Sequence, residues 1–187
     1  MASNRIDVTG VILRDARTRY TTDQREENGA RGAFDAELRR SGRSPRTEVV
    51  VRRAAAPADV AELLGSDGDV VVVRAREMFD GDRVIQLVTT YIPTDVAEAA
   101  GIEQVDTGVG GIISRMKEAG YDQGDTAIED IELRTATSEE SSRLGLPEGS
   151  EVLTINHIGT TADGRVVEVT QHVLGKSWKL RYAAPLA

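Results

Sequence analysis

The sequence contains the same hairpin pattern twice, and this repeat constrains the fold more than any other feature. Residues 81–94 read GDRVIQLVTTYIPT, and about 82 positions later residues 163–175 read DGRVVEVTQHVLG. At both places an Asp–Gly turn leads into a run rich in β-branched residues, which is a strong signal for a β-hairpin. Because the repeat is long and occurs only twice, it does not indicate a solenoid.

Each hairpin is preceded by a strand and a short helix in the same order. These elements occupy residues 47–65 in the first copy and residues 127–146 in the second. Pro57 suits the first turn of one helix, and Thr137 or Ser138 suits the N-cap of the other. Two strand–helix–hairpin halves predict an α+β domain with an antiparallel sheet of about six strands, pseudo-twofold symmetry and helices on one face.

The N-terminal part of the chain lies outside the repeat. Residues 5–13 predict a short strand, whereas residues 14–29 are polar without a clear period and predict a loop or a mobile arm. We therefore divide the chain into an N-terminal arm or linker with a short strand (residues 1–29) and one domain (residues 30–187). Residues 33–41 begin that domain with the apolar spacing of a helix.

Composition excludes several classes of function. The chain has no cysteine, so thiol catalysis and disulfides are excluded, and two histidines argue against a His-rich metal site. A net charge of −8 argues against nucleic acid as a direct partner. No apolar run has the length of a membrane span, and the N-terminus lacks an apolar signal-peptide core. We expect a cytoplasmic protein without metal or cofactor.

Polar side chains share faces of the repeated strands. Because side chains alternate along a strand, Arg74 and Arg76 share one face, and Glu168 and His172 share another, with Glu168 at the place that Gln86 takes in the first copy. The arginines have apolar neighbours on their face, and buried arginines need anionic partners. These five residues predict a polar pocket between the two halves that suits a carboxylate or a phosphate.

Each of these signals also has a structural interpretation. Arg74 and Arg76 are equally typical of solvated cross-strand partners of acidic residues, and a single histidine such as His172 is often a packed or surface residue. The glycine-rich residues 107–111 begin a helix whose free N–H groups suit an anion, but such stretches are also common in flexible loops. The pocket prediction therefore depends on all the residues together.

The order of three stretches resembles the UTRA domain, the effector-binding domain of HutC-type GntR transcriptional regulators. These stretches are RAREMFDGDRVIQLVTTYIP, GGIISRMKEAGY, and TATSEESSRLGLPEGSEVLTINHIGTTADGRVVEVTQHVLGKSWKLRY. The resemblance covers about residues 30–183, nearly the whole chain. It implies a chorismate-lyase-like fold, in which helices lie on one side of a six-stranded antiparallel sheet.

The resemblance also implies which positions contact the effector. They lie on three strands, before the first helix and at the start of the middle helix: Arg74, Arg76, Gln86, Glu168, Phe34, Asp35 and Gly111. Four residues depart from the family pattern. Gln86 stands where an acid is common, and Gly111 stands where members that bind phosphosugars have a serine. Asp35 stands where the family has Ser or Thr, and Leu174 stands where an aromatic residue is often found. These departures favour a carboxylate, a sugar or a similar polar ligand over a sugar phosphate.

Three functions remain open at this stage. The first is a ligand sensor that forms a homodimer and controls DNA binding through a winged helix-turn-helix that this sequence does not contain. The second is an enzyme with a chorismate-lyase-like fold, with Glu168 or His172 as general acid or base, although no nucleophile arrangement is visible. The third is a partner module that forms mixed dimers with full-length regulators.

Overall fold

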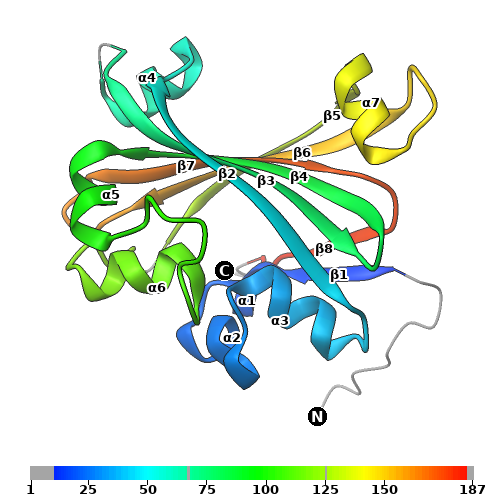
Figure 1. Cartoon of the computed structure of the whole chain (residues 1–187), viewed down its shortest axis with the longest axis horizontal. Coiled ribbons are helices and arrows are strands. Elements are labelled where there is room, and N and C mark those ends of the chain that lie inside the picture. The colour runs from blue at the N-terminus through cyan, green and yellow to red at the C-terminus, as the bar shows by residue number, and fades with distance from the viewer. Residues whose placement is uncertain (1–10, 67, 125, 185–187) are drawn as a thin grey trace.

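A computed structural model of the chain describes residues 11–66, 68–124 and 126–184. The elements in chain order are β1 (Ile12–Asp15), α1 (Ala16–Arg19), α2 (Thr22–Glu26), a 3₁₀ turn η1 (Glu27–Gly29), α3 (Ala33–Arg40), β2 (Pro45–Ala55), α4 (Ala58–Leu64), β3 (Val70–Asp80), β4 (Arg83–Pro93), α5 (Thr94–Ala100), α6 (Gly111–Glu118), β5 (Ile128–Thr135), α7 (Ser138–Leu144), β6 (Glu151–Thr160), β7 (Val166–Leu174) and β8 (Trp178–Arg181). Six strands form one sheet in the order β2–β3–β4–β7–β6–β5 (Figure 1).

The sheet has the predicted pseudo-twofold arrangement. Every neighbouring pair of its strands is antiparallel, and the two halves meet where β4 pairs with β7. Thr89 lies opposite Gln171, the residue 82 positions later, so the symmetry axis passes between these two residues. The second hairpin is therefore the partner of the first across the centre of the sheet. The α+β class and the six-stranded antiparallel sheet are confirmed.

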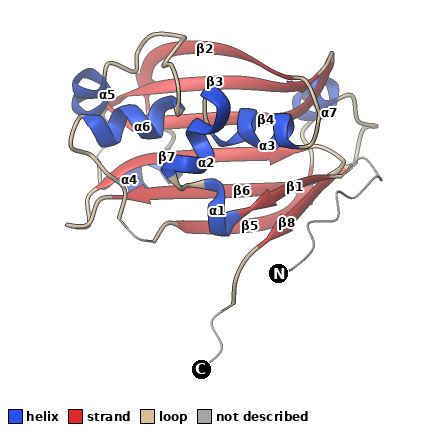
Figure 2. Ribbon diagram, turned by 90° about the horizontal axis from the view of Figure 1, so that it is seen from below, coloured by secondary structure: helices blue, strands red, loops and turns tan. Residues whose placement is uncertain are grey.

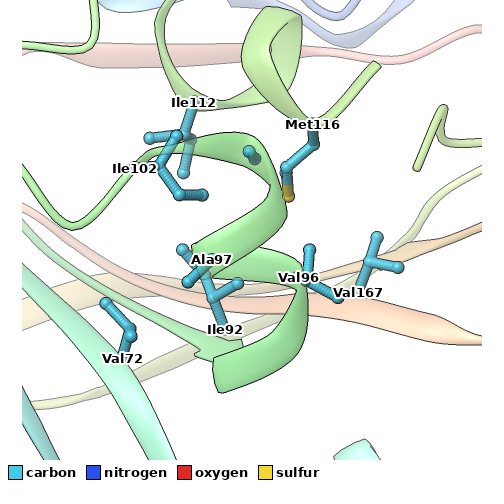
Figure 3. Packing of buried hydrophobic residues seen from close by; sticks show 9 residues of the cluster. Val72, Ile92, Val96, Ala97, Ile102, Ile112, Met116 and Val167 are labelled. Carbon is cyan, nitrogen blue, oxygen red and sulfur yellow. The ribbon is translucent and has the colours of Figure 1, made fainter. Parts of the chain in front are cut away.

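Helices cover both faces of the sheet, which differs from the expected arrangement on one side. One face carries Arg76, Thr90 and His172, and we call it the cavity face. On this face α5 and α6 bury a cluster that includes Ile92 and Met116 (Figure 3), and α3 packs its own apolar residues beside them. The equivalent helices α4 and α7 lie on the opposite face, as Figure 1 shows, because each follows the first strand of its half.

The predicted cap signals are found at the ends of these helices. Thr137 accepts a hydrogen bond from the backbone N–H of Glu140, and Glu140 accepts one from the backbone of Thr137, which completes a capping box. Gly65 ends α4 in the left-handed conformation that a glycine adopts without strain. Local signals thus set where these short helices begin and end.

The N-terminal segment is more structured than its sequence predicted. Residues 5–10 of the expected strand lie outside the described residues, and β1 pairs in parallel with β8. Residues 16–29, expected as a loop, form α1, α2 and a 3₁₀ turn that lie over the cavity face beside α3 and α6 (Figure 2). These helices are too short to be stable alone, so tertiary contacts hold them in place.

Candidate functional site

A cavity of about 320 Å³ opens on the cavity face of the sheet. Its walls are strands β2 and β3, the start of α3, the loop of residues 105–110 with the start of α6, and residues 19–25 of the N-terminal segment. Polar residues of β6 and β7 complete its lining. The cavity therefore lies where the two halves of the sheet meet the helices that cover them.

Seven of the eight candidate residues line this cavity: Phe34, Asp35, Arg74, Arg76, Gly111, Glu168 and His172. Gln86 is fully buried and does not line it. Its side-chain N–H donates to Nδ1 of His172 at 2.6 Å, so Gln86 reaches the cavity only through that ring. Gln86 and Glu168 hold equivalent positions in the two copies, but they lie on opposite sides of the symmetry axis and have different surroundings.

The two candidate arginines of β3 have different partners. Arg74 is buried, and its guanidinium donates to the backbone carbonyls of Ile102 and Gln104 at 2.6 Å each and of Val105 at 3.0 Å. Three carbonyl acceptors satisfy most of its donors, so Arg74 holds the loop that leads to α6. Burial lowers its pKa from the usual value.

Arg76 is the more available guanidinium. It donates to the hydroxyl of Thr90, its Nε has no partner, and no carboxylate of the described residues lies within ion-pair distance. Burial and the neighbouring charge of Arg74 lower the pKa of Arg76 to about 10, so it remains protonated at neutral pH. A partly buried cation without a carboxylate favours an anionic ligand in the cavity.

Two helix N-termini also border the cavity. Helices α3 and α6 have Gly32 and Gly110 as N-caps, and neither has a side-chain cap. A Cβ on Gly111 would lie 3.0 Å from the carbonyl oxygen of Arg31, so only glycine allows the two helix starts to approach this closely. Their uncapped N–H groups and dipoles favour negative charge.

Asp35 lies in the first turn of α3, but other groups already hold its carboxylate. One oxygen accepts from the backbone N–H of Arg31 at 2.9 Å, and the other pairs with Arg39 at 2.7 Å. Its negative charge is therefore largely balanced, and it repels an anion in the cavity less than an unpaired carboxylate would.

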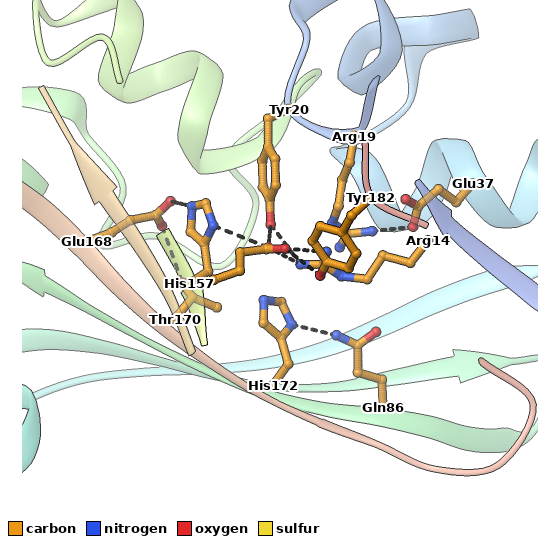
Figure 4. Close-up of polar contacts among 11 residues, drawn as sticks. Arg14, Arg19, Tyr20, Glu37, Gln86, His157, Glu168, Thr170, His172 and Tyr182 are labelled. Carbon is orange, nitrogen blue, oxygen red and sulfur yellow. Dashed lines mark hydrogen bonds and ion pairs between the residues drawn. The ribbon is translucent and has the colours of Figure 1, made fainter. Parts of the chain in front are cut away.

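A chain of buried charged groups runs from the cavity into the N-terminal segment (Figure 4). Glu168 lies 3.5 Å from one ring nitrogen of His157, and Glu129 lies 3.4 Å from the other. Glu129 also accepts from Arg14, with a shortest distance of 2.5 Å. Burial opposes charge on His157, but the two carboxylates outweigh it and raise its pKa above 6.5.

The same contacts affect the carboxylate that lines the cavity. Burial favours the neutral form of Glu168, but the contact with His157 and a 2.6 Å hydrogen bond from Gln123 outweigh it and lower its pKa. Glu168 is therefore an anionic acceptor that suits a hydroxyl or an amine of a ligand. His172 is neutral by contrast, because burial and nearby arginines lower its pKa well below 6.5.

Sequence reasoning missed the cavity residues of the N-terminal segment and of β6. Arg19 pairs with Glu37, and Arg25 donates to the Tyr20 carbonyl and to the Ser114 hydroxyl. His157 of β6 stacks on the ring of Tyr20 from the N-terminal segment. The only sequence signal was an excess of arginine in a polar segment without a helical or strand period.

Metal and membrane signals are absent from the described parts of the chain. Within those residues, no cluster of His, Asp and Glu has an arrangement suited to a metal ion. Likewise, none of the described helices has the length and apolarity needed to cross a bilayer.

Comparison with known families and structures identifies relatives of this fold. The family model of the UTRA domain matches residues 40–175. A solved protein assigned to the GntR-family transcriptional regulators superposes with a TM-score of 0.71 at 23% identity, covering 86% of this chain and 66% of that one. This chain therefore spans slightly less than two thirds of that relative. No curated relative matches the sequence.

Two further solved structures are similar. A protein of Streptomyces coelicolor assigned as a transcriptional regulator is 29% identical, with a TM-score of 0.60, covering 75% of this chain and 91% of that one. PhnF from Mycobacterium smegmatis is 16% identical, with a TM-score of 0.71, covering 94% of this chain and 73% of that one. At 16% identity the likeness to PhnF shows the fold alone.

Proposed function

Because the chain belongs to the UTRA domain family, we propose that it is the effector-binding part of a GntR-type transcriptional regulator of the HutC subfamily. The observation that carries this proposal is the cavity itself: Arg76, which lines it, lacks a carboxylate partner, and two uncapped helix N-termini line the same cavity. A small metabolite with an acidic group supplies the missing partner. The effector is a carboxylate, an acidic sugar or a similar polar molecule.

Recognition divides between the two ends of the cavity. Arg76 and the N–H groups at the start of α6 bind the acidic group, while Glu168 and His172 bind hydroxyl or amine groups of the same molecule. Phe34 contributes apolar surface, since it is 4% exposed in a cluster with Met78. Arg74 and Gln86 act indirectly, because one holds the loop before α6 and the other orients His172.

The proposed output is control of DNA binding by a homodimer in the cytoplasm. The net charge of −8 argues against direct DNA binding by this chain, so a winged helix-turn-helix reads the operator. The edge strands β2 and β5 expose Val50 and Leu133, each more than 60% accessible, and such apolar edges favour pairing with a second copy. Effector binding then shifts the dimer away from the operator-binding state, as in a repressor.

A thermal-shift screen of acidic and polar metabolites tests this function. A ligand at 100 times its dissociation constant stabilises the folded state by about 2.7 kcal/mol. We expect a hit with the parent chain and with Arg83→Gln, a change at the exposed β3–β4 turn, and no shift with Arg76→Gln. Equal shifts in all three proteins would place binding elsewhere. A ligand that is chemically converted during incubation would instead indicate an enzyme.

A further inference from the structure

The N-terminal segment Ala16–Gly29 forms one wall of the effector cavity, although it precedes the residues that the family model matches. Arg19 and Arg25 of this segment are 5% and 3% exposed, and both line the cavity together with Tyr20. A connecting arm normally keeps its charged side chains in water. Two buried guanidiniums on such a short segment therefore call for a specific explanation.

The buried arginines of the N-terminal part differ in one respect. Arg14 pairs with Glu129, and Arg19 pairs with Glu37, so each has a carboxylate within the fold. Arg25 has none within ion-pair distance among the described residues. It donates only to two neutral oxygens, the carbonyl of Tyr20 and the hydroxyl of Ser114, and its Nε has no partner.

Arg25 and Arg76 are thus a pair of guanidiniums in one cavity that both lack a carboxylate partner. Arg74 also lacks a carboxylate, but three loop carbonyls accept from most of its donors. The buried carboxylates Glu168 and Glu129 contact His157, and Glu129 also pairs with Arg14. Leaving buried cations unpaired is unfavourable, so the cavity as it stands favours two negative charges more than one.

We propose that Arg25 is an effector-binding residue opposite Arg76, and that the effector is a small dianion such as a dicarboxylate. This inference rests on the proposed function and adds the segment Ala16–Gly29 to its site. The two ends of the ligand bind to different parts of the fold, one to β3 of the sheet and one to α2 of the N-terminal segment.

The position of Arg25 links occupancy of the cavity to the N-terminal segment. The segment follows β1 directly, and two of its side chains contact Ser114 of α6. Arg25 donates to the Ser114 hydroxyl at 3.3 Å, and Glu26 accepts from it at 2.8 Å. A carboxylate of the dianion gives Arg25 an anionic acceptor, which a guanidinium binds more strongly than a neutral oxygen. Because linkage is reciprocal, a ligand that binds better when the segment is docked also holds the segment docked.

Hydrogen exchange of the full chain with succinate as the probe tests this arrangement. Succinate carries two carboxylates and butyrate carries one on a chain of the same length, so the pair isolates the second charge. Backbone amides of residues 16–29 exchange when the segment opens. At a succinate concentration 100 times the dissociation constant, we expect this exchange to be up to about 100-fold slower. Butyrate leaves the segment unchanged, and α7 (Ser138–Leu144) is the internal reference that neither ligand affects.

Two substitutions assign the effect to the side chain. Arg25→Gln weakens succinate binding at least tenfold and abolishes protection of residues 16–29, whereas Arg25→Lys retains part of both. Arg83→Gln, at the exposed turn, behaves as the parent chain. The comparison of succinate with butyrate on the parent chain stands even if a change at Arg25 perturbs folding.

The outcomes separate this inference from the proposed function. If succinate protects the start of α6 in an Arg76-dependent way but binds Arg25→Gln equally and leaves residues 16–29 unchanged, Arg25 is not a ligand and the effector site stands without it. If succinate, glutarate and inorganic phosphate all leave exchange unchanged everywhere, the dianion assignment is wrong. The metabolite screen then decides the proposed function on its own.

Discussion

The phenol ring of Tyr20 stacks on the imidazole ring of His157, with ring centroids 4.5 Å apart and planes at 18°. The Tyr20 hydroxyl donates to Glu129 at 2.5 Å and accepts from Arg14 at 2.7 Å. This one side chain therefore joins the N-terminal segment to strands β5 and β6. We expect Tyr20→Phe to lower the free energy of unfolding by about 1–3 kcal/mol, because two charged groups each lose a partner.

Urea unfolding of Tyr20→Phe measures this loss, and Tyr91→Phe is the matched control. Tyr91 is 9% exposed, and its hydroxyl has no hydrogen bond to any described residue. The control should change the unfolding free energy by less than about 0.5 kcal/mol. Equal effects of the two substitutions would contradict a specific role for the Tyr20 hydroxyl.

The chain has two histidines, and the fold predicts opposite protonation behaviour for them. The pKa of His157 is raised above 6.5 because its carboxylate contacts outweigh burial, whereas burial and nearby arginines lower that of His172 well below 6.5. In a pH titration of the histidine ring protons by NMR, one resonance should titrate above pH 6.5 and the other well below it. His172→Gln assigns the two signals. Two titrations near 6.5 would show that neither ring is in the environment described.

The raised pKa of His157 also predicts how stability depends on pH. A group whose folded pKa exceeds its unfolded value stabilises the fold fully below the unfolded pKa, about 6.5, and loses this contribution as pH rises through the folded pKa. The difference in unfolding free energy between the parent chain and His157→Gln should therefore shrink from pH 6 to pH 9. His172 contributes with the opposite sign below pH 6.5, and the charge of His157 is one cause of its lowered pKa. The difference therefore reports His157 most directly between pH 7 and pH 9, above the range in which His172 contributes.

The sequence predicted the parts of the site that depend on local pattern. Strand alternation placed Glu168 and His172 on one face, and the Asp–Gly turns located the hairpins that bring them next to β4. The pairing of Tyr20 with His157 was not predictable in this way, because it joins residues 137 positions apart without any periodic signal. The two short helices around it depend on those contacts rather than on their own propensity.

Arg74 and Arg76 were predicted as a pair, but their different contacts lead us to expect opposite effects on stability when each is replaced. Arg74→Met removes the donors of three loop carbonyls and should lower the unfolding free energy by about 2–4 kcal/mol. Arg76→Met removes a cation without a carboxylate partner, so the ligand-free protein should be unchanged or more stable by about 1 kcal/mol. Chemical unfolding without ligand measures both.

Ligand titration completes the comparison of the two arginines. Arg76→Met should bind the effector from the metabolite screen at least tenfold more weakly, a loss of about 1.4 kcal/mol or more. Arg83→Met serves as the control for removal of a positive charge, because this residue lies at the exposed turn. A large stability loss in Arg76→Met with unchanged affinity would mean that Arg76, like Arg74, serves the fold rather than the ligand.

Gly159 keeps Glu168 in position, although it lies on the neighbouring strand β6. A Cβ at Gly159 would lie 2.5 Å from the side-chain nitrogen of Gln123 and 2.8 Å from Cγ of Glu168, closer than real atoms approach. Gly159→Ala therefore requires these side chains to shift, and we expect it to disrupt the 2.6 Å hydrogen bond between them. Because Glu168 lines the cavity, we expect effector affinity to fall at least tenfold, with a stability loss of about 1–3 kcal/mol.

Gly124→Ala is the matched control for this effect, because Gly124 follows Gln123 directly. Its added Cβ would meet its nearest neighbour at 3.5 Å, an ordinary contact, and the position has no positive φ. Calorimetric titration should give parental affinity for Gly124→Ala and reduced affinity for Gly159→Ala. If Gly159→Ala binds normally despite its stability loss, the position of Glu168 does not matter for the ligand. Recognition would then depend on the cationic side of the cavity alone.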